Sequence, residues 1–180
     1  MTLSQVNSPA MTRRQEARGN PAVEPLWEIL DQVTDPEIPV LSLWDLGILQ
    51  NVERQGDAVV VTITTTYSGC PAMDVIGDDI RQALQQAGYV NVTVKQRLSP
   101  AWTTDWISAE GRRKLLEYGI APPAEASSSK NALLGGQPIV PCPLCGSTRT
   151  ERLSEFGSTA CKALYRCQDC REPFDYFKCI

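Results

Sequence analysis

Four cysteines near the C-terminus form two Cys-x-x-Cys pairs, Cys142 with Cys145 and Cys167 with Cys170. A Cys-x-x-Cys turn presents two sulfurs on one side of a tight loop, and two such turns supply the four thiolates of a tetrahedral metal site. Gly146, directly after the first pair, suits the backbone twist that points amide groups at a sulfur. The spacing therefore predicts a four-cysteine metal site, with disulfides or ordinary buried thiols as the alternative.

Two more tail cysteines, Cys161 and Cys179, fall outside this spacing. They are additional ligands, a second site or plain structural thiols, so the choice of four ligands among six stays open. The chain has no histidine, which leaves sulfur and carboxylate as the ligands for any metal. Soft thiolates select zinc and iron–sulfur clusters. Zinc is the expected occupant, with iron or a transient iron–sulfur cluster as the alternative.

A seventh cysteine, Cys70, lies where a predicted strand meets a predicted helix. Free amides and the helix dipole favour a thiolate at such a junction, whereas Asp74 one turn later opposes it. Cys70 is thus either a reactive or metal-contacting thiol or a small core residue. Asp35 and Glu37 stand two apart on proline-restricted backbone, so their carboxylates can project to the same side. A role in the turn is the alternative for both.

The elements that must position these residues follow from periodicity. Helical spacing of apolar residues predicts a helix over 23–33, and a second helix begins at Pro71 and ends before Gly88. Alternating residues predict three strands, the first two joined by a turn at 55–57. The strands are expected at 46–54, 58–66 and 89–98. The fold class is a small two-layer α/β (α+β) domain over residues 20–120.

The remaining segments are predicted from composition. Residues 1–19 are expected to be a disordered leader, and 121–138 a linker rich in Pro, Ser and Gly. Residues 139–180 then form a zinc-ribbon-like domain with a four-cysteine site and a hairpin over 156–165. Trp102 and Trp106 either pack on the first domain or mark a docking patch. A helix is expected from Ser108 to Tyr118.

Charge and hydropathy limit the function classes. A net charge of −4 over 180 residues argues against general nucleic-acid binding. No apolar run reaches the roughly 18 residues that span a bilayer, and the first residues lack the apolar core of a signal peptide. We therefore expect a cytoplasmic protein with reduced thiols, in which metal binding is favoured over disulfides.

Two families share motifs with the chain. Asp35-Pro36-Glu37 followed by residues 66–71 (Thr-Tyr-Ser-Gly-Cys-Pro) resembles the metal–sulfur cluster biosynthesis (SufT-like) family over residues 24–98. Residues 67–72, 100–106, 156–165 and 171–180 resemble the D subunits of the phenylacetyl-CoA epoxidase (ring 1,2-epoxidase) system. This second resemblance implies that Cys70 is a reactive or cluster-contacting thiol, with Asp35 and Glu37 nearby.

The resemblance also implies a role. Such a D subunit would be an accessory protein rather than an enzyme, and it would help to mature the di-iron oxygenase subunit or the flavin and iron–sulfur reductase subunit. Those subunits and the iron–sulfur assembly machinery are then the expected partners, and homo-oligomerisation stays open. The alternative is a non-catalytic adaptor with a structural zinc ribbon. An enzyme with Cys70 as nucleophile is disfavoured because no histidine can activate it.

Overall fold

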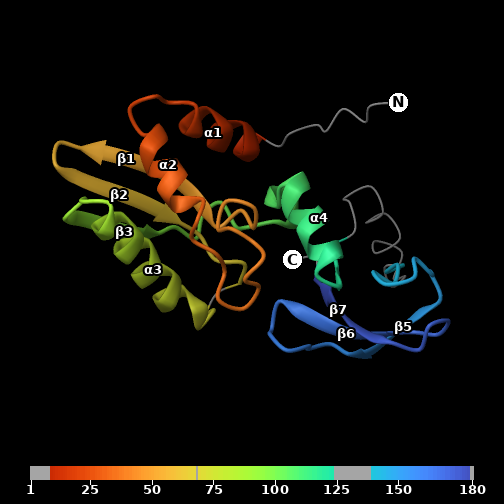
Figure 1. Ribbon diagram of the computed structural model, residues 1–180. Coiled ribbons are helices and arrows are strands. Elements are labelled where there is room, and N and C mark those ends of the chain that lie inside the picture. Colours follow the sequence, from red (N-terminus) through yellow and green to blue (C-terminus); the bar gives the residue numbers. More distant parts are fainter. Residues whose placement is uncertain (1–8, 68, 124–138, 179–180) are drawn as a thin grey trace. The chain divides into compact units, whose positions relative to one another are not determined.

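The computed structural model describes residues 9–67, 69–123 and 139–178, with side chains from residue 12 onward (Figure 1). The chain divides into two compact units. The N-terminal unit comprises Met1–Trp102 with Trp106–Ser108, and the C-terminal unit comprises Thr103–Asp105 with Ala109–Ile180. Each unit has its own sheet, as the predicted mixed α/β fold requires.

The N-terminal sheet has three strands, with β2 (Ala58–Ile63) between β1 (Leu49–Gln55) and β3 (Asn91–Gln96). The β1–β2 pair is an antiparallel hairpin, and β2 pairs with β3 in parallel. The central strand is a nearly continuous run of buried apolar residues, which suits a strand with neighbours on both sides. The predicted hairpin and third strand are confirmed, although each strand is shorter than its pattern suggested.

Helix α3 (Ala72–Gln86) connects β2 to β3, and α2 (Glu24–Leu30) contacts α3 in a layer beside the sheet. The apolar faces of the two helices supply much of the core. Its fully buried members include Leu26, Trp27, Leu30, Ile76, Ile80 and Leu84. Gly88 follows α3 with a φ of 95°, the left-handed backbone that ends a helix at glycine with little strain.

The expectation of a disordered leader is wrong for residues 9–18, which form helix α1 (Pro9–Arg18). Arg14 is buried and donates hydrogen bonds to the carbonyl oxygens of Leu49, Trp44 and Trp106 at 3.1, 2.9 and 3.1 Å. Its guanidinium also stacks on the Trp44 ring. Because α1 is held by guanidinium contacts rather than by an apolar stripe, hydrophobic periodicity could not reveal it.

The two tryptophans after β3 pack into the N-terminal unit rather than forming a docking patch. Both are buried, and the Trp102 indole N–H donates to the Leu46 carbonyl oxygen at 3.0 Å. Trp106 ends the short 3-10 helix η1 (Thr104–Trp106). The Ser108 hydroxyl then donates to the Asp45 carboxylate at 2.6 Å, which ties the end of this segment to the same loop.

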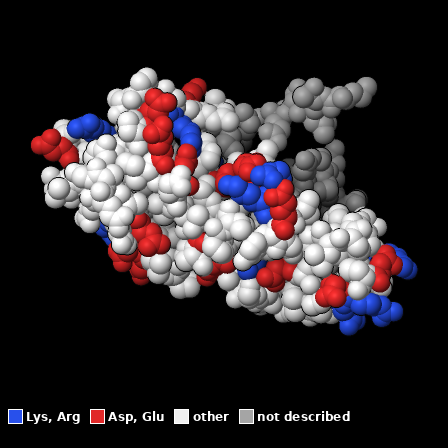
Figure 2. All heavy atoms as spheres, in the orientation of Figure 1, with Lys and Arg blue, Asp and Glu red and all other residues white. Residues whose placement is uncertain are grey.

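The C-terminal unit contains α4 (Ala109–Glu117) and a four-stranded sheet in the order β4-β7-β6-β5. The four strands are β4 (Ile120–Ala121), β5 (Thr150–Ser154), β6 (Lys162–Cys167) and β7 (Pro173–Phe177). Ion pairs of Arg113 with Glu110 and Glu117 line the exposed face of α4, where blue and red side chains interleave in Figure 2. The predicted helix is thus present.

The boundary between the two units differs from the one predicted at residue 120. Strand β4 pairs in parallel with β7, with Ile120 opposite Asp175, so α4 and β4 belong to the C-terminal unit. A two-residue strand has too short a pattern to be recognised before its partner is known. Residue 121, predicted as the first linker position, belongs to β4. Linker positions 124–138 lie outside the described residues.

Gly157 lies in the β5–β6 turn against a buried ion pair. Lys162 is buried, and its Nζ is 3.3 Å from Asp175 Oδ2, which also accepts a hydrogen bond from the Ser158 hydroxyl. A Cβ at Gly157 would lie 2.6 Å from Asp175 Oδ1. We expect Gly157→Ala to displace this carboxylate and lower the free energy of unfolding by about 3 kcal/mol, measured by urea denaturation.

The matched control for Gly157→Ala is Ser158→Ala, which removes one partly exposed hydrogen bond and leaves the ion pair in place. It should cost about 1 kcal/mol. Equal losses in the two variants would show that the Lys162–Asp175 pair adapts to the added methyl group.

Candidate metal centre

Two turns of the C-terminal unit bring the four paired cysteines together. In the first turn the Gly146 N–H donates to the Cys142 carbonyl oxygen at 2.9 Å, with Gly146 at a φ of 74°. In the second, Cys167 ends β6, and the Asp169 N–H points at its sulfur at 3.4 Å. All four Sγ atoms lie within 4.8 Å of one another.

The spacing of these sulfurs fits one tetrahedral ion. Zinc–sulfur bonds of about 2.3 Å place neighbouring sulfurs of a tetrahedron about 3.8 Å apart. The Cys142–Cys170 and Cys145–Cys167 sulfur pairs are separated by 3.8 and 3.5 Å. Cys142 and Cys167 are buried, whereas Cys145 is exposed and Cys170 partly so. The donor set thus supports a metal site.

The close packing of the sulfurs shifts the pKa values of two thiols in opposite directions. Desolvation alone would raise the pKa of Cys167, but hydrogen bonds from the Cys170 amide and the neighbouring thiols lower that pKa to about 7. For Cys170 the Glu172 amide favours the thiolate, but burial and the thiol contacts raise the pKa to about 12. The Cys167 sulfur therefore loses its proton more readily than that of Cys170, and a bound cation must displace the Cys170 proton.

Polar side chains next to the cysteines join the two turns. The Ser147 hydroxyl donates to the Asp169 carboxylate, and Arg149 Nε donates to Asp169 Oδ2 at 3.2 Å. The Gln168 N–H donates to the Arg149 carbonyl oxygen at 2.8 Å. These contacts fix the second turn against the first, as outer contacts of metal ligands do. Their sequence signal, polar residues beside each Cys pair, was present but not specific.

Of the other two tail cysteines, only Cys161 is among the described residues. Cys161 is buried and is not one of the four clustered sulfurs, and its Sγ lies 3.0 Å from the Thr159 hydroxyl. It lies directly before β6, and a role as an additional ligand stays a prediction. Cys179 lies outside the described residues, so its predicted role stays a prediction.

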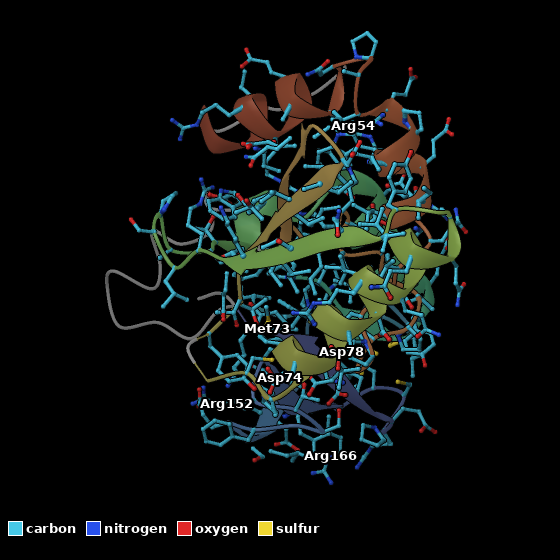
Figure 3. All side chains as sticks on the ribbon, turned by 90° about the vertical axis from the view of Figure 1, so that its left-hand side faces the viewer. Arg54, Met73, Asp74, Asp78, Arg152 and Arg166 are labelled. Carbon is cyan, nitrogen blue, oxygen red and sulfur yellow. The ribbon has the colours of Figure 1, made fainter. Side chains whose placement is uncertain are left out.

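Cys70 lies in the connection between β2 and α3, as predicted, and is a free, partly exposed thiol. Gly69 before it has a φ of 87°, which turns the chain toward the helix. A hollow of about 320 Å³ begins in the first turn of α3, lined in part by Met73, Asp74 and Asp78. Figure 3 shows these three side chains along the same end of α3. Arg81 also lines this hollow and pairs with Asp78, whereas Cys70 is not among the lining residues.

Asp35 and Glu37 have separate environments. Asp35 is buried, and its Oδ1 accepts hydrogen bonds from the Glu37 and Ile38 N–H groups at 2.8 and 2.9 Å. These bonds close the turn after Asp35, and its predicted functional role stays a prediction. Glu37 is partly exposed. Within the described residues, the tail sulfurs are the only group of three or more potential metal ligands, and a joint role of Cys70, Asp35 and Glu37 stays a prediction.

Comparison with known proteins divides the chain in a similar way. Residues 24–95 match the family described as iron-sulfur cluster assembly protein, and residues 126–178 match the PaaD zinc beta ribbon domain. A putative 1,2-phenylacetyl-CoA epoxidase D subunit from Escherichia coli (strain K12) is 52% identical over 160 residues, which cover 89% of this chain and 94% of that protein.

Two shorter relatives match the N-terminal part. An Fe-S protein maturation auxiliary factor from Porphyromonas gingivalis is 37% identical over 54% of this chain and 90% of its own length. The Bacillus subtilis factor of the same description is 36% identical over 44% of this chain and 78% of its own length. In the part of the chain that the structure describes, no helix is long and apolar enough to cross a membrane. The extent and identity of the Escherichia coli match show that the chain belongs to the family of 1,2-phenylacetyl-CoA epoxidase D subunits.

Proposed function

We propose that the chain is a cytoplasmic accessory factor that delivers iron or an iron–sulfur cluster to a phenylacetyl-CoA epoxidase complex through Cys70. The observation that carries the proposal is a free, partly exposed thiol in the connection directly before α3, inside the segment that matches iron–sulfur assembly proteins. Relatives of this segment bear the name of Fe–S maturation factors. The client is the di-iron oxygenase subunit or the flavin and iron–sulfur reductase subunit.

The chemistry at Cys70 is ligand exchange. A thiolate holds iron or one iron of a cluster, and a client thiolate or carboxylate replaces it when the client docks. The exchange transfers no electrons, so it needs neither an oxidant nor a general base. Partial exposure suits this role, because a fully buried sulfur could not reach the incoming ligand.

The tail site has a different role in this proposal. We assign zinc to it, since the sulfur separations suit one tetrahedral ion. In an iron–sulfur cluster the four cysteines are distributed over two or four irons, which would place some of the sulfurs farther apart. Zinc supplies the folding energy of the ribbon and takes no part in iron transfer.

The test compares epoxidase complexes purified from cells that carry wild-type, Cys70→Ala or Cys161→Ala chains. Cys70→Ala should lower the iron content and turnover of the complex roughly tenfold, as loss of a metal contact commonly does. The Cys161→Ala control removes a thiol outside the four-sulfur cluster and should leave both readouts unchanged. Circular dichroism verifies that each variant is folded.

A second function, a non-catalytic adaptor that tethers subunits, is favoured by apolar side chains on the ribbon. Leu144, Leu153 and Phe156 are each about half exposed or more. An adaptor predicts that Cys70→Ala complexes keep normal iron and activity. That result would overturn the delivery function and leave tethering as the role of the chain.

A further inference from the structure

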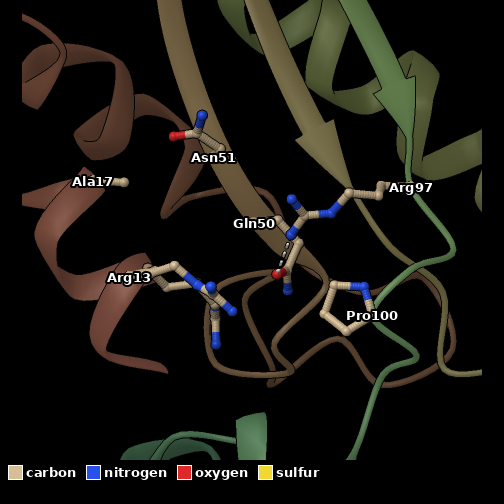
Figure 4. Close-up of a pocket in the computed structure, with 7 residues that line it drawn as sticks. Arg13, Ala17, Gln50, Asn51, Arg97 and Pro100 are labelled. Carbon is tan, nitrogen blue, oxygen red and sulfur yellow. Dashed lines mark hydrogen bonds between the residues drawn. The ribbon is translucent and has the colours of Figure 1, made fainter. Parts of the chain in front are cut away.

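A hollow of about 350 Å³ in the N-terminal unit has a lining of described residues that contains three arginines and no acidic residue. The lining includes Arg13 and Arg14 from α1, Gln50 and Asn51 from β1, and Arg97 and Pro100 after β3. Figure 4 shows Arg13 reaching in from α1 and Arg97 from the opposite side, with Gln50 between them. The concentration of positive charge is unexpected in a chain with 21 acidic and 17 basic residues.

Two of these arginines have no acidic partner in the described parts of the chain. Arg97 donates one hydrogen bond, to Gln50 Oε1 at 3.3 Å, and Arg13 has no ion pair there. Many other arginines are neutralised locally. Examples are Arg18 with Asp31, Arg81 with Asp78, Arg113 with Glu110 and Arg166 with Glu151. Like charges facing one open space repel each other unless an anion lies between them.

The hollow is held in shape by buried polar contacts. Gln50 is 4% exposed; its Nε2 donates to the Gly47 carbonyl oxygen at 2.7 Å, so its Oε1 is fixed toward Arg97. Arg14 donates to three backbone carbonyl groups, but its charge remains. Burial lowers its pKa to about 10, which still leaves the guanidinium positive at neutral pH. The charge of Arg14 thus adds to the potential in the hollow.

We propose that this hollow binds a small phosphate-bearing anion of the diphosphate or nucleotide class, with Arg13 and Arg97 as its two ligands. Guanidinium forks match phosphate oxygens, and a diphosphate has enough oxygens to accept bonds from two forks on opposite sides. A single carboxylate, with two oxygens, satisfies only one fork in bidentate geometry. The volume is at the small end for ligand sites, which suits such an anion. The inference does not depend on iron delivery by Cys70.

Isothermal titration calorimetry on the full-length, zinc-loaded protein tests the site with pyrophosphate and ADP as probes. Arg13→Gln and Arg97→Gln should each weaken pyrophosphate binding about tenfold, because each removes a charge-assisted contact. The matched control is Arg54→Gln, since Arg54 is an exposed arginine of the same unit that donates to the Gly56 carbonyl oxygen and does not line the hollow. It should bind like the wild type. Thermal melts verify that the variants are folded.

The proposal fails if pyrophosphate and ADP do not bind at millimolar concentration, or if Arg54→Gln weakens binding as much as the hollow variants do. A hexaglutamate peptide in the same titration examines the other anion class. Tighter binding of the peptide than of pyrophosphate, with loss in Arg13→Gln and Arg97→Gln, would overturn the phosphate assignment and identify a docking site for an acidic protein segment.

Discussion

A Cys167→Ser variant is expected to lose its metal ion and the fold of the β5–β7 sheet together. Cys167 is fully buried at the end of β6 and belongs to the small core of this unit. The cluster around it has eight buried residues among those described, and two of them belong to the four-cysteine group: Ala121, Val140, Cys142, Ala163, Tyr165, Cys167, Phe174 and Tyr176. So little apolar burial cannot offset chain entropy alone. A structural zinc ion contributes roughly 10 kcal/mol, so the loss should be complete.

The measurement combines zinc quantification by mass spectrometry with NMR of the Tyr165 and Tyr176 rings, which pack edge to face in this core. Cys161→Ala is the control, since it removes a buried thiol beside β6 that is not one of the four clustered sulfurs. It should keep one zinc per chain and dispersed ring signals. Retention of both properties by Cys167→Ser would contradict the dependence of this sheet on the ion.

Proton competition governs the affinity of the four sulfurs for the ion. Cys170 holds its proton firmly, with a pKa raised to about 12 in the metal-free cluster, so the cation must displace that proton to bind. The lowered pKa of Cys167 makes its sulfur the easier of the two to deprotonate. Metal affinity therefore falls as pH falls, and the stability that the ion gives to the sheet falls with it.

Periodicity predicted the elements whose apolar faces form the core. The helix and hairpin patterns at 23–33 and 46–66 correspond to α2, β1 and β2, and Gly88 ends α3 as expected. Helix α1 was missed because its anchor is Arg14, a residue type that usually marks the surface. The unit boundary was missed because the β4–β7 pairing joins residues more than fifty positions apart.

The candidate sites also differ in how far they could be predicted, because some are formed by neighbouring residues in the sequence and others by distant ones. The Cys-x-x-Cys spacing is a local pattern with few structural solutions, and the four sulfurs do converge. The pattern of Asp35 and Glu37 fitted a turn or a functional pair, and the structure shows the Asp35 carboxylate bonded within its turn. The arginine hollow brings together Arg13, Gln50 and Arg97 from three separate parts of the chain. No spacing rule connects those positions, so only the fold could reveal it.

The second large effect is expected at Gly47, where the loop before β1 meets Trp106. Gly47 has a φ of 79°, and a Cβ there would lie 2.8 Å from Trp106 Cβ and 2.9 Å from the Trp106 carbonyl oxygen. Gly47→Ala therefore suffers left-handed strain of about 1–2 kcal/mol and a clash with backbone that cannot move independently. We expect a total loss of about 4 kcal/mol in the free energy of unfolding, measured by urea denaturation.

Gly56→Ala separates the two contributions. Gly56 also has a positive φ, of 61°, in the β1–β2 turn, but an added Cβ would meet nothing within 4 Å. This variant has the backbone strain without the clash, so its free energy of unfolding should fall by only about 1 kcal/mol. The difference between the variants measures how tightly Trp106 is packed on the N-terminal unit. Equal losses would mean that the tryptophan segment yields to the methyl group, and its packing would then contribute little to the stability of this unit.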